Sequence, residues 1–282
     1  MSSGKLFVCS TPIGNLEDVT LRVLRILGEV DVIAAEDTRM TRKLLNKYKI
    51  KTPLESYHEH NEIKKSKKLV ERLKQGLSLA LVSDAGTPGL SDPGYRLIKA
   101  CIEAEIDMDV LPGPFAAVTA LVASGLPADR FVFQGFVPRK QGQRKKVLQD
   151  LSQEKGTLIF YESCHRIKRF LEDATEILGE RPVVMARELT KKYEEIIRGT
   201  MSDVLSVSQE RELKGEIVMV IAGVSESKEI PAPAIMRAQL KTLMAGGLSK
   251  KDAIKKLAVQ ANIPKRVVYE IAKTIPNSSS RD

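Results

Sequence analysis

Acidic and basic side chains of this chain gather in short turns that directly follow apolar runs. Glu36-Asp37-Thr38-Arg39 follows one run, Tyr161-Glu162-Ser163-Cys164-His165-Arg166 a second, and Ala186-Arg187-Glu188-Leu189-Thr190-Lys191 a third. Carboxylates can accept a proton, and neighbouring Arg and Lys side chains can hold an anion or stabilise developing negative charge. These turns are therefore candidates for acid–base and electrostatic catalysis.

A longer turn, Ser83-Asp84-Ala85-Gly86-Thr87-Pro88-Gly89-Leu90-Ser91-Asp92-Pro93-Gly94, follows the apolar run at residues 77–82. Its glycines and prolines remove bulk and fix the backbone, so that peptide N–H groups can face a ligand while Asp84 and Asp92 supply acceptors. The alternative is a plain surface turn before a helix that begins near Gly94.

Two further turns, Ser10-Thr11-Pro12-Ile13-Gly14-Asn15 and Leu111-Pro112-Gly113-Pro114, have the same character. Ligands in α/β proteins bind at the carboxyl ends of the strands, so six such turns predict a cleft that two domains share. No Gly-x-Gly-x-x-Gly follows a strand and no phosphate-binding Gly-Lys-Ser/Thr is present, so the usual dinucleotide and P-loop signatures are missing. The three histidines have no metal-ligand spacing, and no metal is expected.

The elements that must position these turns form an α/β pattern. A first domain at residues 1–126 has predicted strands at 6–10, 32–35, 77–82 and 108–111, alternating with helices at 17–27, 38–47, 61–75, 95–103 and 114–124. Asn15 or Asp18 is expected to cap the first helix, and Pro114 is expected at the first position of the last.

A second α/β domain is predicted at residues 127–223. It has expected strands at 131–135, 157–162, 183–188 and 217–222 and helices at 142–153 and 164–178, with its last two strands joined through residues 194–199 and a short helix at 202–209. Residues 224–234 indicate a linker stiffened by Pro231 and Pro233. Residues 235–282 then predict three short helices, at 235–245, 250–260 and 265–275, in an arrangement like a helix-turn-helix.

Positive charge is concentrated in this C-terminal piece. The chain has 282 residues and a net charge of +9, and residues 232–282 hold ten Lys and Arg against three Asp and Glu, a net charge of +7. A polyanion partner is the natural inference, although a solvated helical surface has the same composition. The apolar runs are far shorter than the ~20 residues of a membrane helix, and no secretion signal is visible, so a cytoplasmic location is expected.

The motifs, taken together, resemble the tetrapyrrole methylase family, and within it the members that methylate small-subunit ribosomal RNA. The resemblance runs in order from Leu6 to about Gly223 and rests on Thr11-Pro-Ile-Gly-Asn-Leu, Glu36-Asp-Thr-Arg, Ser83-Asp-Ala-Gly-Thr-Pro, Ser91-Asp-Pro-Gly, Leu111-Pro-Gly-Pro, Phe133-Gln-Gly-Phe-Val-Pro, Tyr161-Glu-Ser-Cys-His-Arg, Arg187-Glu-Leu-Thr-Lys and Gly215-Glu-Ile-Val. Cys164 stands where Pro is common. The helical tail also looks like the appendage of many members.

The resemblance implies two α/β domains of the class III methyltransferase type, with a methyl-donor cleft between them and a small C-terminal helical domain. It implies S-adenosylmethionine as donor and the 2′-hydroxyl of a cytidine in the decoding region of 16S ribosomal RNA, free or in a 30S particle, as acceptor. A homodimer is also implied. By the same resemblance the donor-site residues are Thr11, Pro12, Asp84, Ala85, Gly86, Thr87, Ser91, Pro112, Gly113, Ala116, Ala117, Tyr161, Glu162 and Leu189.

A ribose hydroxyl is a poor nucleophile, so a nearby base or cation is expected to help. Asp37 ranks first as the base, before Glu162 and Glu188, because carboxylate and guanidinium share one strand end; the alternative is that Asp37 only caps a helix. Arg39, Arg187 or Lys191 is expected to orient a phosphate or to stabilise the oxygen. The residues expected to contact RNA are Arg39, Arg139, Lys140, Arg144, Lys145, Arg166, Lys250, Lys251, Lys265 and Arg266.

Two other functions remain compatible with the sequence. One is methylation of a tetrapyrrole or another small molecule, which the family fold permits. The other is a non-catalytic RNA-binding role in ribosome assembly.

Overall fold

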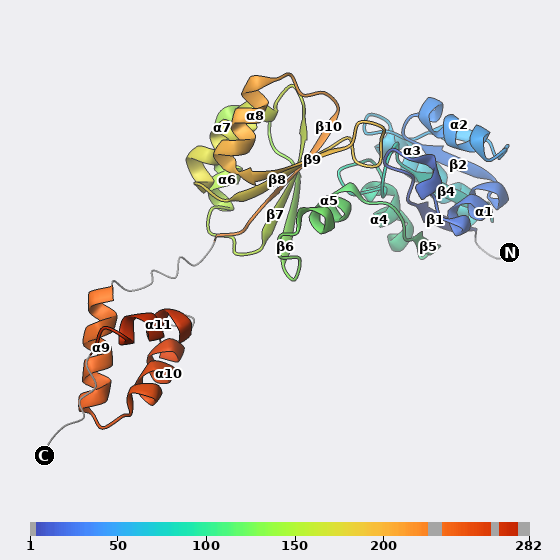
Figure 1. Ribbon diagram of the computed structural model, residues 1–282. Coiled ribbons are helices and arrows are strands. Elements are labelled where there is room, and N and C mark those ends of the chain that lie inside the picture. The colour runs from blue at the N-terminus through green and yellow to red at the C-terminus, as the bar shows by residue number, and fades with distance from the viewer. Residues whose placement is uncertain (1–3, 225–232, 261–264, 276–282) are drawn as a thin grey trace, which may run out of the picture. The chain divides into compact units, whose positions relative to one another are not determined.

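The computed structural model describes residues 4–224, 233–260 and 265–275. The chain divides into two compact units, Met1–Val224 and Ser225–Asp282 (Figure 1). None of the described helices is both long and apolar enough to cross a membrane. The linker predicted at residues 224–234 falls mostly outside the described residues.

The first unit begins with a parallel sheet in the order β3-β2-β4-β1-β5. Its strands are β1 (Lys5–Cys9), β2 (Val32–Ala35), β3 (Leu54–Ser56), β4 (Leu79–Val82) and β5 (Asp107–Leu111). In β4, Leu79 and Leu81 pack toward α3 (Glu62–Lys74) and α4 (Tyr95–Glu103), whereas Ala80 and Val82 pack toward α1 (Leu21–Glu29) and α2 (Thr38–Lys47). Because both faces are covered, β2 and β4 are apolar at every position.

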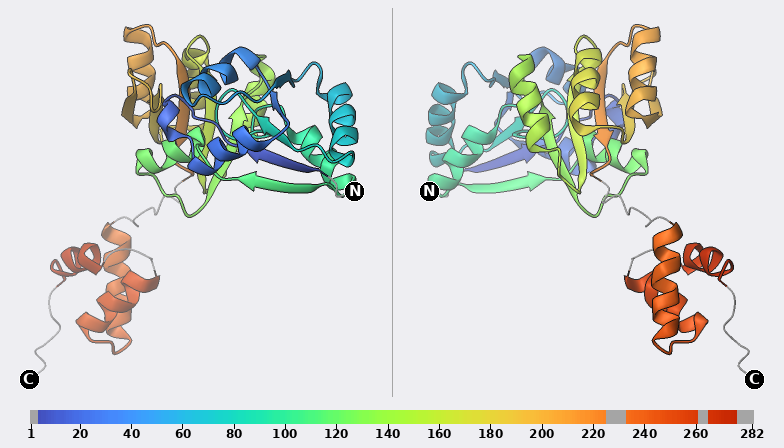
Figure 2. Two further views of the ribbon diagram at one scale, coloured as in Figure 1. Left: turned by 90° about the vertical axis from the view of Figure 1, so that its right-hand side faces the viewer. Right: turned by 90° about the vertical axis from the view of Figure 1, so that its left-hand side faces the viewer.

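The second sheet is mixed, in the order β6-β7-β10-β8-β9. Its strands are β6 (Phe131–Phe136), β7 (Thr157–Ser163), β8 (Pro182–Arg187), β9 (Glu195–Thr200) and β10 (Glu216–Ile221). Of the neighbouring pairs only β6 and β7 are parallel, and the other three pairs are antiparallel. One face is covered by α6 (Gln141–Asp150), α7 (Ile167–Leu178) and α8 (Met201–Glu210), which lie together on one side of the sheet in Figure 2.

Helix α5 (Ala116–Ser124) joins the two halves of this unit. It follows the first sheet in the chain, yet Ala117, Ala120 and Leu121 pack against Val184 and Val218 on the open face of the second sheet (Figure 1). The segment before α5 therefore bridges the carboxyl end of β5 and the second sheet. Gly125, in the left-handed conformation that favours glycine, follows α5, and the predicted helix end at residue 124 is confirmed.

Several predicted boundaries were wrong. The helix expected at residues 17–27 is split into a 3₁₀ turn η1 (Leu16–Asp18), capped by Asn15, and α1, capped by the Thr20 hydroxyl. Pro114 lies outside α5, which begins at Ala116. Strands β3 and β9 were missed because both lie at sheet edges, where neither a buried apolar run nor clean alternation is needed. The helix predicted at residues 38–47 is confirmed as α2.

The second unit is a bundle of α9 (Pro233–Ala245), α10 (Lys250–Gln260) and α11 (Lys265–Ala272). Its own core includes Met236, Leu240, Leu257 and Val268. The Ser249 hydroxyl accepts the Asp252 N–H and caps α10. The predicted helical tail is thus present as an independently packed unit.

Candidate functional site

Two of the predicted turns are tied together at the carboxyl ends of β1 and β4. The Thr11 N–H donates to Gly86 O (2.8 Å) and the Gly86 N–H to Thr11 O (3.0 Å), while the Thr11 hydroxyl donates to Ser83 O (3.0 Å). Gly86 has φ +77°, a conformation that glycine adopts without strain. Thr11 therefore fixes the shape of the loop.

The loop at residues 83–94 also contacts the second sheet. A Cβ at Gly135 would lie 2.7 Å from the Ser91 Oγ, and Gly135 has φ +67°, so only glycine suits this position. The β6–β7 register shifts between Phe133 and Gly135, a bulge that re-aims the end of β6. The loop at residues 83–94 thus meets β6 across the junction of the two halves.

A cavity of about 230 Å³ lies at this junction, and we call it the central cavity. Both halves of the first unit line it, as do small side chains and several apolar ones. The lining residues are Ile13, Ala85, Gly86, Thr87, Leu90, Ser91, Asp92, Phe115, Ala116, Phe136, Tyr161, Glu162, Ser163, Ala186, Leu189, Gly215, Glu216, Ile217 and Val218.

Two neighbouring hollows share walls with the central cavity. The side cavity, about 410 Å³, shares Thr87 and Phe115 with it and is also lined by Pro112 and Gly113. The outer cavity, about 750 Å³, shares Phe136, Glu162 and Ser163 with it. Every predicted turn except residues 35–39 supplies a residue to the central or the side cavity.

The structure places the expected donor residues in three groups. Those that line the central cavity are Ala85, Gly86, Thr87, Ser91, Ala116, Tyr161, Glu162 and Leu189. Pro112 and Gly113 line the side cavity. Thr11 and Pro12 are buried behind the loop, Ala117 is buried in the packing of α5, and Asp84 accepts the Asp37 N–H (2.9 Å).

Three acidic residues, Asp92, Glu162 and Glu216, are among those that line the central cavity. Burial raises the pKa of Asp92 to about 7, with help from the negative charges of Glu36 and Asp84. Burial also raises the pKa of Glu162, whose side chain is fully buried and pairs with the Arg166 guanidinium at 3.0 Å. The cavity therefore offers negative charge and one carboxyl group that titrates near neutral pH.

Asp37 does not suit the role of base that the sequence gives it. Its carboxylate caps α2 by accepting the Arg39 N–H (2.8 Å) and pairs with the Arg39 guanidinium (2.7 Å). The Arg39 side chain holds the pKa of Asp37 at about 2, so that carboxylate is a weak proton acceptor. Asp37 lines none of the three cavities, and its contacts are those of a helix cap.

Glu188 and Lys191 lie beside the central cavity without lining it. The Lys191 ammonium pairs with Glu188 (3.0 Å) and with Glu216 (2.8 Å), and the Glu216 N–H donates to the Glu188 carboxylate (3.0 Å). Burial acts to lower the pKa of Lys191, but the two carboxylates outweigh it and raise the pKa. Lys191 therefore stays charged and holds Glu216 at the cavity wall.

The expected RNA contacts separate by exposure. Arg39, Arg139, Lys140, Lys251, Lys265 and Arg266 are exposed. Lys145 pairs with Glu176 (2.7 Å), Arg166 pairs with Glu162 and donates to Val137 O, and the Lys250 ammonium donates to Ile275 O (2.8 Å).

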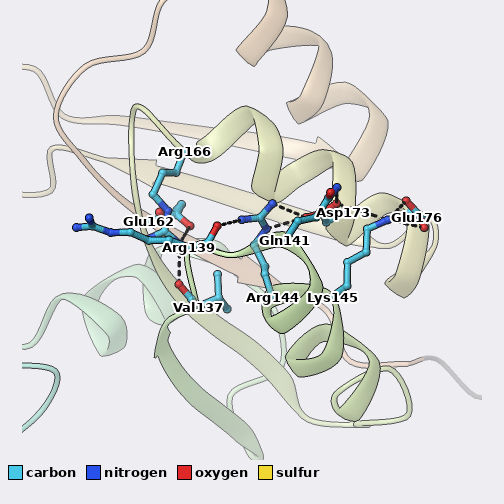
Figure 3. Close-up of polar contacts among 9 residues, drawn as sticks. All are labelled: Val137, Arg139, Gln141, Arg144, Lys145, Glu162, Arg166, Asp173 and Glu176. Atoms are coloured by element: carbon cyan, nitrogen blue, oxygen red, sulfur yellow. Dashed lines mark hydrogen bonds and ion pairs between the residues drawn. The ribbon is translucent and has the colours of Figure 1, made fainter.

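Arg144 was wrongly predicted as an RNA contact. Its guanidinium is buried on α6, where it binds the buried Asp173 carboxylate of α7 at 2.6 Å and donates to Arg139 O at 3.0 Å (Figure 3). Gln141 also donates to Asp173 (2.9 Å). A pair that lies under the helices can stabilise them but cannot offer its charge to an RNA backbone.

Arg144→Lys is expected to lower the free energy of unfolding by roughly 1.5–3 kcal/mol, the value of a lost hydrogen bond to a charged group. Lysine keeps the charge but loses the planar guanidinium that reaches Asp173 and Arg139 O together. Urea unfolding measures the loss. An unchanged midpoint together with weaker RNA binding would instead return Arg144 to the RNA surface.

Sequence reasoning gave no role to several residues that line the central cavity. Asp92 was noted only as an acceptor, and Gly215-Glu216-Ile217-Val218 only as a motif, although all four of its residues line the cavity. The signal in the sequence that could have identified these residues is the occurrence of several such motifs in one chain. Within the parts of the chain that the structure describes, no group of three or more His, Cys, Asp or Glu side chains could hold a metal ion.

Comparison with known proteins places this geometry in a family. The model of the Tetrapyrrole (Corrin/Porphyrin) Methylases matches residues 5–205. Ribosomal RNA small subunit methyltransferase I of Halalkalibacterium halodurans is 47% identical over 272 residues, 95% of this chain and 94% of that protein. The protein of the same name from Thermotoga maritima is 46% identical over 220 residues, which cover 78% of this chain and 99% of that shorter relative.

Solved structures show the same fold at low identity. The methyltransferase CobJ matches with a TM-score of 0.61 and 21% identity, covering 79% of this chain and 95% of CobJ. Uroporphyrin-III-C-methyltransferase from Thermus thermophilus matches with a TM-score of 0.57 and 22% identity, covering 78% of this chain and 94% of that enzyme.

Proposed function

Because this chain belongs to the tetrapyrrole methylase family, we propose that it transfers a methyl group from S-adenosylmethionine to the 2′-hydroxyl of a cytidine in the decoding region of 16S ribosomal RNA. The central cavity carries this proposal, because both halves of the first unit line it and most of the expected donor residues meet there. Close relatives that are named as small-subunit rRNA methyltransferases support the substrate class.

The central cavity fits the methyl donor chemically. S-adenosylmethionine, when bound, supplies an electrophilic methyl group on a positively charged sulfur. Ala85, Gly86 and Ala116 leave room for a ligand to approach the backbone, and Asp92 supplies a carboxyl group to the wall. The other two acidic residues of the wall are already paired, Glu162 with Arg166 and Glu216 with Lys191. The side cavity at Pro112 and Gly113 gives the donor further space.

Asp92 is the carboxylate that we propose as acceptor of the hydroxyl proton. It lines the cavity, whereas Asp37 and Glu188 do not, and Glu162 is already committed to Arg166. A base is most effective when its pKa lies near the working pH, and the pKa of Asp92 at about 7 meets that condition. Lys191 acts as a positioning residue that fixes Glu216.

The second unit is proposed to bind RNA through its positive charge. Residues 232–282 have a net charge of +7, and Lys251, Lys265 and Arg266 are exposed. Phosphate contacts of this kind add affinity without choosing a sequence.

Deletion of residues 232–282 is expected to weaken RNA binding and leave donor binding unchanged. Each lost phosphate contact lowers the slope of log affinity against log salt by about 0.7–0.9, so the slope is expected to fall by about 2–3. Titration of RNA at several salt concentrations measures it. An unchanged slope would contradict an electrostatic role for this unit.

We also propose that the protein acts in the cytoplasm as a homodimer. Both parts of this proposal rest on the resemblance to the tetrapyrrole methylase family.

Labelled methyl transfer tests the proposed substrate. The acceptors are 30S subunits that lack the modification, naked 16S RNA and a tetrapyrrole precursor. We expect label in one or both RNA acceptors and none in the tetrapyrrole. Label only in the tetrapyrrole would favour a small-molecule methylase, and RNA binding without any transfer would favour an assembly factor.

A further inference from the structure

The outer cavity is lined by an aromatic ring and by cationic or hydrogen-bonding side chains. Its residues are Phe136, Val137, Pro138, Arg139, Glu162, Ser163, His165 and Arg166. Three of them also line the central cavity, so the two hollows are neighbours with a common wall. A molecule in the outer cavity would lie next to the proposed donor site.

Phe136 presents an unusually open ring for an aromatic side chain at a strand end. It is 55% exposed and rests edge-on against Tyr161, with ring centroids 5.6 Å apart. The bulge at Gly135 sets its position, and Tyr161 backs it from the next strand. An exposed ring fixed in this way is a platform on which a nucleic-acid base can stack.

Two arginines, the buried Arg144 and the partly exposed Arg166, hold the segment after Phe136. Arg166 donates to Val137 O (2.6 Å) and Arg144 donates to Arg139 O (3.0 Å). Each of these arginines is itself fixed by a buried carboxylate, Glu162 or Asp173, as Figure 3 shows. The backbone of residues 137–139 is thereby anchored at both ends.

Arg139 itself is free to bind a ligand. Its side chain is exposed and points away from the buried ion pairs in Figure 3. Among the residues that the structure describes, no hydrogen bond or ion pair joins its guanidinium to another side chain. His165, also exposed, lines the same cavity and offers imidazole N–H groups. Guanidinium and imidazole groups are suited to a phosphate.

We propose that the outer cavity binds the nucleotide that is methylated, with its base against Phe136 and its phosphate between Arg139 and His165. This assignment rests on the proposed function, and it requires the target nucleotide to be unpaired, as sequence-specific RNA recognition and chemistry on nucleotides commonly require. The shared wall of Phe136, Glu162 and Ser163 then brings the ribose beside the central cavity.

The test uses the full chain and a fluorescent single-stranded pentacytidylate as the binding probe. Phe136→Ala is expected to weaken probe binding by about 10- to 100-fold, the range for one lost base stack, and Phe136→Tyr to restore it. Arg139→Ala is expected to weaken binding and lower the salt slope by about 1. Arg169→Ala, which removes a charge from an exposed site on α7 outside the cavities, is the matched control.

Binding of S-adenosylhomocysteine and methylation of 30S subunits complete the experiment. Supporting results are normal donor binding in Phe136→Ala, with a raised KM or a lowered kcat for RNA. The subsite is wrong if Phe136→Ala binds the probe normally, if it loses donor binding to the same extent, or if Arg169→Ala matches Arg139→Ala. Absence of methylation by the wild-type protein would refute the proposed function instead, and the probe titration would still decide the subsite.

Discussion

The Asp92→Asn variant is expected to bind donor and RNA but to transfer methyl groups about 10²–10⁴-fold more slowly, the usual effect of losing a general base. Asparagine has nearly the same shape and cannot accept the proton. The change removes a cavity-lining carboxyl group whose pKa is raised to about 7. The measurement is kcat with saturating donor and RNA. A kcat within a few-fold of wild type would remove Asp92 as the base.

The pH dependence of kcat is a second test of Asp92 as the base. Asp92 accepts a proton only when ionised, so the wild-type kcat should rise with pH, turn over near pH 7 and stay level above it. Asp92→Asn should lack this inflection. A second variant, Glu36→Gln, tests the cause of the raised pKa. The charge of Glu36 helps to raise the pKa of Asp92, so its loss should move the inflection to lower pH. An inflection that Glu36→Gln leaves in place would belong to another group.

Ala116→Phe is expected to weaken binding of S-adenosylhomocysteine by about 100-fold. Ala116 begins α5 and lines the central cavity, so a phenyl ring there would fill much of a space of about 230 Å³. Steric conflicts of this kind cost about 1–3 kcal/mol even where the surroundings relax. Isothermal titration calorimetry measures the affinity.

Val122→Phe is the matched control for Ala116→Phe. Val122 is on the same helix, is 74% exposed and lines none of the three cavities. The Val122→Phe variant should bind S-adenosylhomocysteine with the affinity of the wild-type protein. Equal donor affinity in both variants would mean that the donor binds elsewhere.

Much of the fold could be predicted because local sequence and packing agree. Strands β2 and β4 are apolar at every position since helices cover both faces, and α2 is bounded by Asp37, whose side chain caps its first turn. Edge strand β9 was missed because it needs little burial. The sequence also did not predict which sheet α5 packs against, because the apolar surface of a helix is compatible with either sheet.

The site was predicted as a region, but the roles of its residues depended on distant neighbours. Arg144 lies among Lys and Arg residues in the sequence, a pattern that is typical of an exposed segment. In the structure its guanidinium is buried and pairs with Asp173 of the following helix, α7. Asp37 and Arg39 pair with each other, which turns a candidate base into a cap. Asp92 gains its raised pKa from burial, from Glu36 at the end of β2 and from Asp84 in its own loop, and neither the burial nor the Glu36 charge can be seen in the local sequence.

The most direct test of the proposed function is the chemical identity of the methylated nucleoside. Subunits of 30S that lack the modification are incubated with methyl-labelled S-adenosylmethionine and the protein, and the RNA is digested and analysed by mass spectrometry. We predict that the label appears in 2′-O-methylcytidine from one fragment of the decoding region. Label in a base-methylated nucleoside, or no label in the RNA at all, would contradict the account.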